Sequence, residues 1–281
     1  MKKEVIISFV KNLRLLRTAS FLLIYFFGWY FGWYFSSLPS DYIKLILGLI
    51  SVFFSWQFCI SINDIFDIEI DKISNPTRPY VKGYLNKKSS IIWSIILIAA
   101  SLIFGIFLGL FSFIFVIFFI ILGYIYSAPP IRFRKYLFGT IFIGLASAIS
   151  YFIGIFSTVF YILPEQIMIG VLILVALSIG PIVKDYKDYE GDKKAGVSTI
   201  FTKFGLEKGT KITSVLLFLT FLLPLVLIHH LLDFIILLSM GVLVSLLFNY
   251  KKIQKKVQFT MGLFFIAIIY IFLRIIGIII I

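Results

Sequence analysis

Nine long apolar runs, unbroken by charge, constrain this chain more than any other feature. They have the length of helices that cross a bilayer and lack the strict alternation of barrel strands. Lipid offers the backbone no hydrogen-bond partners, so only helices or closed barrels can span it. The sequence therefore predicts an all-α, polytopic membrane protein with nine transmembrane helices, near Thr18–Phe35, Tyr42–Ile62, Ile91–Gly109, Phe111–Tyr126, Phe138–Leu163, Gln166–Val183, Ile212–His229, Leu231–Phe248 and Phe259–Ile281.

Composition supports a membrane location. Hydrophobic residues make up 61% of the 281 residues and charged residues only 14%. A soluble domain of this length could not enclose so much apolar surface and still present a wettable exterior. A single cysteine, Cys59, excludes a disulfide framework.

The basic residues predict the orientation in the cell membrane. All of them except Lys44 and Arg274 fall in the N-terminal segment or after the second, fourth, sixth and eighth spans. The positive-inside rule makes this side cytoplasmic, with the N-terminus inside and the C-terminus outside. The net charge of +13 is thus a topology signal suited to membrane lipid, and it does not indicate a nucleic-acid partner. Alternating apolar and basic residues over Val5–Leu16 predict an interfacial helix.

Two acidic clusters of identical spacing follow the second and sixth spans. The pattern D-x-x-D-x-E-x-D-K occurs over Asp64–Lys72 and again over Asp185–Lys193. On a helix, the three aspartates of each cluster fall within about 60° of one another, whereas Glu69 and Glu190 point elsewhere. The candidate carboxylates are Asp64, Asp67, Asp71, Asp185, Asp188 and Asp192. The repeat is consistent with a duplication inside a single domain over 1–281, with halves near 1–130 and 131–281.

Clustered carboxylates at a membrane exit repel one another and favour a bound cation. Oxygen ligands indicate Mg²⁺, or Mn²⁺ in its place, which keeps waters and also binds substrate phosphate. One such cluster could as well be a solvated loop, but two with the same spacing favour a site. Basic side chains follow the second and fourth spans and could hold diphosphate oxygens and stabilise the leaving group, among them Arg78, Arg132, Arg134 and Lys135.

The order of the motifs resembles the UbiA superfamily of intramembrane prenyltransferases. It is N-D-x-x-D-x-x-x-D from Asn63, N-P-x-R-P from Asn75, Y-S-A-P-P-x-R from Tyr126, and K-D-x-x-D-x-E-G-D-K from Lys184. The resemblance implies nine helices around a central cavity, capped by the cytoplasmic loops after the second and sixth spans. It also implies that both aspartate clusters bind a prenyl diphosphate through Mg²⁺. The diphosphate-binding residues implied by it are Asn63, Arg17, Arg78, Tyr126, Arg132, Arg134, Lys135 and Lys184.

The resemblance implies transfer of a prenyl group to a lipophilic acceptor after cleavage of its bond to diphosphate. The Y-S-A-P-P and K-D-x-x-D-x-E-G-D segments resemble branches with aromatic, quinone-precursor or tetrapyrrole-like acceptors. The alternative is a geranylgeranylglyceryl phosphate geranylgeranyltransferase of ether-lipid synthesis. That branch usually has Arg-Glu shortly before the second motif, where this chain has Gly180-Pro181-Ile182-Val183.

A divalent-cation transporter is an alternative from another class. It predicts polar residues along a path through the membrane. The outer halves of the spans offer few, because Asp41, Glu165 and Asp233 are expected in outer loops and only Arg274 within a span. The sequence therefore favours prenyl transfer, and it leaves the acceptor and the oligomeric state open.

Overall fold

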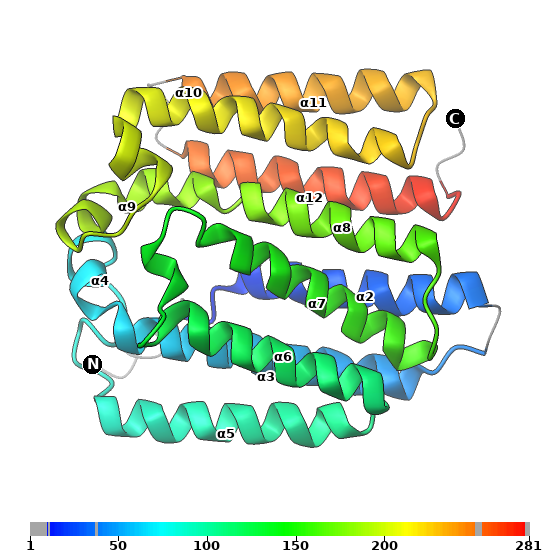
Figure 1. Cartoon of the computed structure of the whole chain (residues 1–281), viewed down its shortest axis with the longest axis horizontal. Helices are drawn as coiled ribbons and strands as arrows, with labels where there is room; N and C mark the ends of the chain where they lie inside the picture. Colours follow the sequence, from blue (N-terminus) through cyan, green and yellow to red (C-terminus); the bar gives the residue numbers. More distant parts are fainter. Residues whose placement is uncertain (1–9, 11, 37–38, 251–254, 279–281) are drawn as a thin grey trace. The chain divides into compact units, whose positions relative to one another are not determined.

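The structure is a computed structural model that describes residues 10, 12–36, 39–250 and 255–278. These residues form helices and connections without a strand (Figure 1), so the predicted all-α class is confirmed. The helices are α2 (Leu15–Ser36), α3 (Tyr42–Phe66), α4 (Ile68–Ser74), α5 (Lys87–Ile106), α6 (Leu110–Ser127), α7 (Thr140–Thr158), α8 (Pro164–Ile179), α9 (Ile182–Lys194), α10 (Ile200–Leu222), α11 (Leu231–Asn249) and α12 (Lys256–Ile275), with short 3₁₀ turns at Phe133–Lys135 and Leu223–Val226.

In the described ranges, nine helical segments are long and apolar enough to cross a membrane, and each overlaps a predicted span. The boundaries differ most where a helix carries charge. The α10 helix begins at Ile200 rather than Ile212, and the sixth segment continues to Lys194. Hydropathy reports the part of a helix that lies in lipid, so it misses turns that continue into water. Half of the predicted interfacial helix Val5–Leu16, residues 5–9 and 11, lies outside the described residues.

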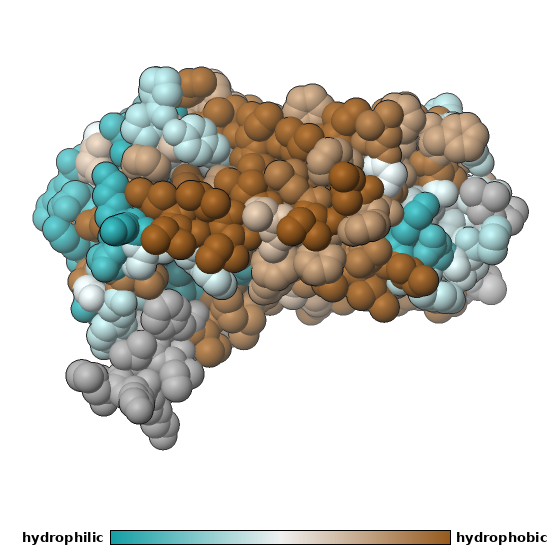
Figure 2. All heavy atoms as spheres, turned by 90° about the horizontal axis from the view of Figure 1, so that it is seen from below, coloured by the Kyte–Doolittle hydropathy of each residue, from teal (hydrophilic) through white to brown (hydrophobic). Residues whose placement is uncertain are grey.

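The helices expose apolar side chains and bury some polar ones, as expected of a protein that is surrounded by lipid. On α5, Ile92 and Ile95 are exposed, whereas Ser101 is buried against α3. There Ser101 Oγ lies 2.5 Å from Ser55 Oγ, and Ser51 Oγ donates to the Ser101 carbonyl at 2.9 Å. Small hydroxyl residues allow helices to approach closely in membranes. Apolar side chains also cover the middle of the face shown in Figure 2, with hydrophilic ones gathered toward its ends.

The chain divides into two compact units. The first comprises Met1–Arg134 with Leu145–Val171, and the second comprises Lys135–Gly144 with Leu172–Ile281. In the first unit, α3 packs against α2, α5 and α6. The α2 and α7 helices cross at Gly28 and Gly154, where an added Cβ would overlap the carbonyls of Tyr151 and Tyr25.

In the second unit, α10 packs against α9 and α11, and α12 packs against α11 and α9. Val183, Phe201, Leu217 and Phe248 form part of its core and hold α9 in place. One prediction about this unit is wrong. Asp233 was expected in an outer loop, but it lies buried in the first turn of α11.

Candidate functional site

The first acidic cluster lies at a break between two helices. The α3 helix ends at Phe66, Asp67 has non-helical dihedrals, and α4 begins at Ile68. The single continuous helix assumed from the sequence is therefore wrong here. The hydrogen-bond ladder nevertheless runs through the break, because the Asp67 amide donates to the Asn63 carbonyl at 2.9 Å and the Asp71 amide donates to the Asp67 carbonyl at 2.8 Å.

This continuity keeps the three aspartates together. Asp64, Asp67 and Asp71 are at most 2% exposed. Glu69 is exposed and pairs with Lys72 at 2.7 Å, as its helical phase predicts. Carboxylates so deeply buried require positive partners nearby.

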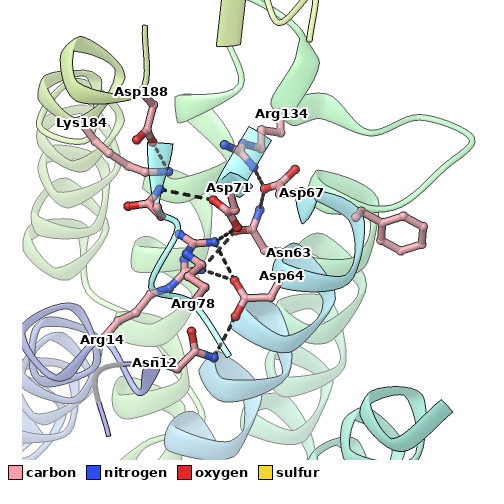
Figure 3. A network of polar contacts seen from close by, with 12 residues as sticks. Asn12, Arg14, Asn63, Asp64, Asp67, Asp71, Arg78, Arg134, Lys184 and Asp188 are labelled. Carbon is pink, nitrogen blue, oxygen red and sulfur yellow. Dashed lines mark hydrogen bonds and ion pairs between the residues drawn. The ribbon is translucent and has the colours of Figure 1, made fainter. Parts of the chain in front are cut away.

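Arginines from the segment after α6 bind Asp67. Arg132 Nη2 donates to Asp67 Oδ1 at 2.8 Å and to the Phe66 carbonyl at 2.6 Å. Arg134 forms an ion pair with Asp67 Oδ2, and the Asn63 amide donates to the same oxygen (Figure 3). Two of the three basic residues predicted in this segment therefore reach the first cluster.

Asp64 and Asp71 share another arginine. Arg78 Nη1 donates to Asp64 Oδ1 at 2.8 Å and also pairs with Asp71 Oδ2. Two residues before α2 complete the shell of Asp64: Arg14 Nη2 donates to Oδ1 at 2.5 Å, and Asn12 Nδ2 donates to Oδ2 at 2.8 Å. Figure 3 shows these side chains converging on Asp64 from different parts of the chain.

The first cluster is dominated by arginine charge. Four guanidinium groups, from Arg14, Arg78, Arg132 and Arg134, contact the three carboxylates. Burial lowers the pKa of Arg14, an effect that the neighbouring Asp64 carboxylate opposes, and burial also lowers the pKa of Arg132. An arginine remains charged under such shifts, so the group can attract further anions.

The second acidic cluster lies on α9 without a break. Asp188 and Asp192 are buried, Asp185 is half-buried, and Glu190 is exposed. Lys184 Nζ forms an ion pair with Asp188 Oδ2 at 3.1 Å. The two clusters thus share their spacing and the exposure of their glutamates, but they differ in local backbone.

A buried lysine packs beside the second cluster. Lys256, at the start of α12, is 4% exposed, and its Nζ lies 3.5 Å from the centroid of the Tyr186 ring on α9. It also donates to the Phe248 carbonyl at 3.2 Å. In the sequence, Lys256 is distinguished only as one of the basic residues after the eighth predicted span.

The remaining predicted residues lie at element ends. Arg17 is in the first turn of α2 and Tyr126 near the end of α6, both half-buried, while Lys135 is exposed. Sequence reasoning missed Asn12 and Arg14. Arg14 was counted only for its charge, and no periodicity relates it to a carboxylate fifty residues away.

The donor set fits magnesium. Among the described residues, no three His, Cys, Asp or Glu side chains lie close enough to hold a metal ion together. Mg²⁺ does not require such a group, because it usually binds one or two carboxylates and completes its shell with waters and substrate phosphates. The buried carboxylates supply only oxygen ligands, and the arginines now beside them are cations in contact with the same oxygens.

Comparison with known proteins agrees with the motifs. The profile described as the UbiA prenyltransferase family matches residues 21–273. Digeranylgeranylglyceryl phosphate synthase of Methanocaldococcus jannaschii is 34% identical over 203 residues, which cover 72% of this chain and 67% of the relative. The synthase of Methanosphaera stadtmanae is 28% identical over 74% of this chain and 75% of its own. A probable homogentisate phytyltransferase of Oryza sativa is 29% identical over 58% and 45%.

Solved structures share the fold. A UbiA homologue from Archaeoglobus fulgidus, bound to DMAPP and Mg²⁺, superposes with a TM-score of 0.73 at 22% identity and covers 97% of this chain and all of its own. A digeranylgeranylglyceryl phosphate synthase structure gives a TM-score of 0.64 at 23% identity, covering 97% and 98%. The family match extends over nearly the whole chain and sets the transporter alternative aside. This chain belongs to the UbiA prenyltransferase family and is a multi-pass membrane prenyltransferase.

Proposed function

We propose that this prenyltransferase transfers a prenyl group from a magnesium-bound prenyl diphosphate to geranylgeranylglyceryl phosphate. The assignment of the acceptor rests on the similarity to digeranylgeranylglyceryl phosphate synthases, one of which is 34% identical. This similarity favours the ether-lipid alternative over aromatic, quinone-precursor or tetrapyrrole-like acceptors. An identity that extends over most of the chain is a stronger signal than the missing Arg-Glu pair before the second motif.

The first cluster supplies part of the diphosphate site in this proposal. Asp64, Asp67 and Asp71 bind the metal, and Asn63 orients the Asp67 carboxylate through its amide. When held there, Mg²⁺, or Mn²⁺ in its place, would supply positive charge to the diphosphate and so assist cleavage of the bond to the prenyl carbon. Arg78, Arg132 and Arg134 donate to the diphosphate oxygens as negative charge develops on them. Their low exposure supports this role, because hydrogen bonds from charged donors strengthen where water is excluded.

The second cluster has the corresponding role on α9. Asp185, Asp188 and Asp192 bind metal, and Lys184, which already pairs with Asp188, donates to the diphosphate. The same spacing of carboxylates at the end of a membrane helix supports this assignment. We also assign to diphosphate binding the remaining residues implied by the family resemblance, Arg17, Tyr126 and Lys135.

The proposed orientation places both motifs on the cytoplasmic side of the cell membrane, with the N-terminus inside and the C-terminus outside. Its support is the basic residues, nearly all of which fall on one side of nine spans. Substrates made in the cytoplasm would then reach the carboxylates without crossing the bilayer.

An acceptor panel tests the proposed function. Purified enzyme is given labelled geranylgeranyl diphosphate, Mg²⁺ and one acceptor at a time: geranylgeranylglyceryl phosphate, homogentisate, 4-hydroxybenzoate or a chlorophyllide. Mass spectrometry should detect a prenylated product with geranylgeranylglyceryl phosphate only. A product with homogentisate alone would instead support the aromatic alternative, which the rice relative represents. Absence of product with geranylgeranylglyceryl phosphate would contradict the proposal.

A further inference from the structure

The segment before α2 reaches the first acidic cluster. Arg14 Nη2 lies 2.5 Å from Asp64 Oδ1 and 3.3 Å from Asn63 Oδ1, and Asn12 Nδ2 lies 2.8 Å from Asp64 Oδ2. Arg78 also donates to Oδ1. Donors therefore bind both oxygens of a carboxylate proposed as a metal ligand, and two of these donors, Arg14 and Asn12, come from a segment without an assigned role.

Local structure fixes the direction of Arg14. Its φ of 49° is a left-handed conformation that residues with a Cβ disfavour. The turn is held by Thr18, whose hydroxyl donates to the Leu13 carbonyl at 2.6 Å. Trp56 Nε1 and Gln57 Nε2 on α3 each donate to that hydroxyl at 3.1 Å. A strained backbone that several contacts maintain is common at functional sites.

We propose that Arg14 is a diphosphate-binding residue that the metal releases: it neutralises Asp64 in the metal-free enzyme and turns to the diphosphate once Asp64 binds Mg²⁺. This inference rests on the proposed function. The reason is electrostatic. A guanidinium 2.5 Å from Asp64 Oδ1 and a divalent ion on the same oxygen would repel each other at close range. An anion placed between the two cations removes that repulsion, so Arg14 keeps a favourable contact only if diphosphate binds as well.

Arg14 should therefore affect the two ligands in opposite directions. Without diphosphate, it competes with Mg²⁺ for Asp64 and weakens metal binding. With Mg²⁺ present, it donates to the diphosphate and strengthens binding of that anion. Such coupling makes binding of the metal and of the diphosphate cooperative. A residue needed only for folding would weaken both equilibria when replaced.

The test is calorimetry on the full-length enzyme in detergent, without acceptor. One titration uses Mg²⁺ alone, and the other uses geranyl diphosphate at saturating Mg²⁺. Arg14→Gln should bind Mg²⁺ about threefold more tightly than the wild type, because one nearby positive charge is gone. It should bind geranyl diphosphate about tenfold more weakly, the loss expected for a charge-assisted hydrogen bond.

Lys72→Gln is the matched control. It removes one positive charge from α4, but Lys72 is exposed and pairs with Glu69 rather than with the aspartates. Both dissociation constants should remain at the wild-type values. If Arg14→Gln does not fold, Arg14→Lys is tested instead, because it keeps the positive charge but lacks the bidentate donor geometry of a guanidinium. Its Mg²⁺ affinity should match the wild type, and its geranyl diphosphate affinity should fall.

The outcomes separate this inference from the proposed function. A wild-type enzyme that binds neither Mg²⁺ nor geranyl diphosphate contradicts the proposed function itself. If the wild type binds both, the inference fails when Arg14→Gln leaves both constants unchanged or weakens both. It also fails if Arg14→Lys, used in place of a misfolded glutamine variant, keeps the wild-type affinity for geranyl diphosphate.

Discussion

Arg274 donates two parallel hydrogen bonds to Asp233, from Nε to Oδ1 and from Nη2 to Oδ2, each 2.6 Å long. The pair joins the last turn of α12 to the first turn of α11, with Asp233 fully buried and Arg274 13% exposed. The Tyr270 hydroxyl donates to Asp233 Oδ1 at 2.5 Å. Within the second unit, α11 therefore has a buried ion pair at the end opposite Phe248, the residue that contacts Lys256.

Breaking this pair from one side should destabilise the protein. Asp233→Leu or Arg274→Met leaves the other charge buried without its partner, at a cost of about 3 kcal/mol. The double variant removes both charges and should recover most of the loss, since apolar residues of similar size replace a buried pair well. Thermal unfolding in detergent should show a melting temperature lower by about 5–10 °C for either single variant.

The exposed pair between Glu207 and Lys211 provides the control, because Glu207→Gln should change the melting temperature little. A double variant as unstable as the sum of the two single variants would show that Asp233 and Arg274 do not act as a pair.

Loss of one buried carboxylate from either cluster should abolish prenyl transfer. Asp67→Asn and Asp188→Asn keep the shape of the side chain but remove a negative charge that metal ligation requires. Transfer of labelled prenyl groups, followed at limiting Mg²⁺, should fall to background for both variants. Membrane insertion and the melting temperature should show a folded protein.

The glutamates at the equivalent position of the two motifs serve as matched controls for these variants. Glu69→Gln and Glu190→Gln remove the same charge from the same motifs, but both side chains are exposed. Their turnover should stay within about twofold of the wild type, as for surface substitutions in general. Retained turnover in Asp67→Asn or Asp188→Asn would count against the assigned ligands.

The sequence predicted the helices well because lipid leaves the backbone little choice. Apolar runs alone located nine spans, each of which overlaps a helix. It did not locate the ends of helices whose terminal turns carry charge, as in α10. It also did not identify a charged side chain that is buried inside the protein. The sequence did not signal the burial of Asp233, because its partner Arg274 lies 41 residues away and no local pattern indicates such a pair.

The sequence indicated which aspartates of the first cluster lie together, but it did not indicate their contacts. Spacing alone selected the three aspartates of the first cluster and set Glu69 aside. The helix break at Asp67 was not predictable, because its carboxylate is held by Arg132 and Arg134 from a distant segment. The internal duplication also remains a prediction. The two motifs share their spacing, but the helix is broken at Asp67 in the first motif and continuous in the second.

Metal removal should prevent binding of the prenyl diphosphate. The arginines of the first cluster are engaged by its carboxylates, so without a metal to bind those carboxylates few donors are left for an incoming anion. Calorimetry with geranylgeranyl diphosphate should show binding in the presence of Mg²⁺ or Mn²⁺ and none after treatment with a chelator. The same signal should return when Mg²⁺ is added in excess of the chelator. Tight binding in the chelator would show that the arginines alone hold the diphosphate.

Lys256 and Tyr186 should prove energetically coupled. The ammonium group lies 3.5 Å from the centroid of the ring and is almost fully buried, which strengthens a cation–π contact. A cycle of Lys256→Met, Tyr186→Leu and the double variant, measured by chemical unfolding in detergent, should give a coupling free energy of about 1–2 kcal/mol. Lys255→Met is the control, since this neighbouring lysine is exposed and should show no coupling to Tyr186. Equal coupling free energies for both lysines would mean that Tyr186 is stabilised by positive charge in general and not by the buried contact with Lys256. In that case, the apolar core alone would hold α9 in position.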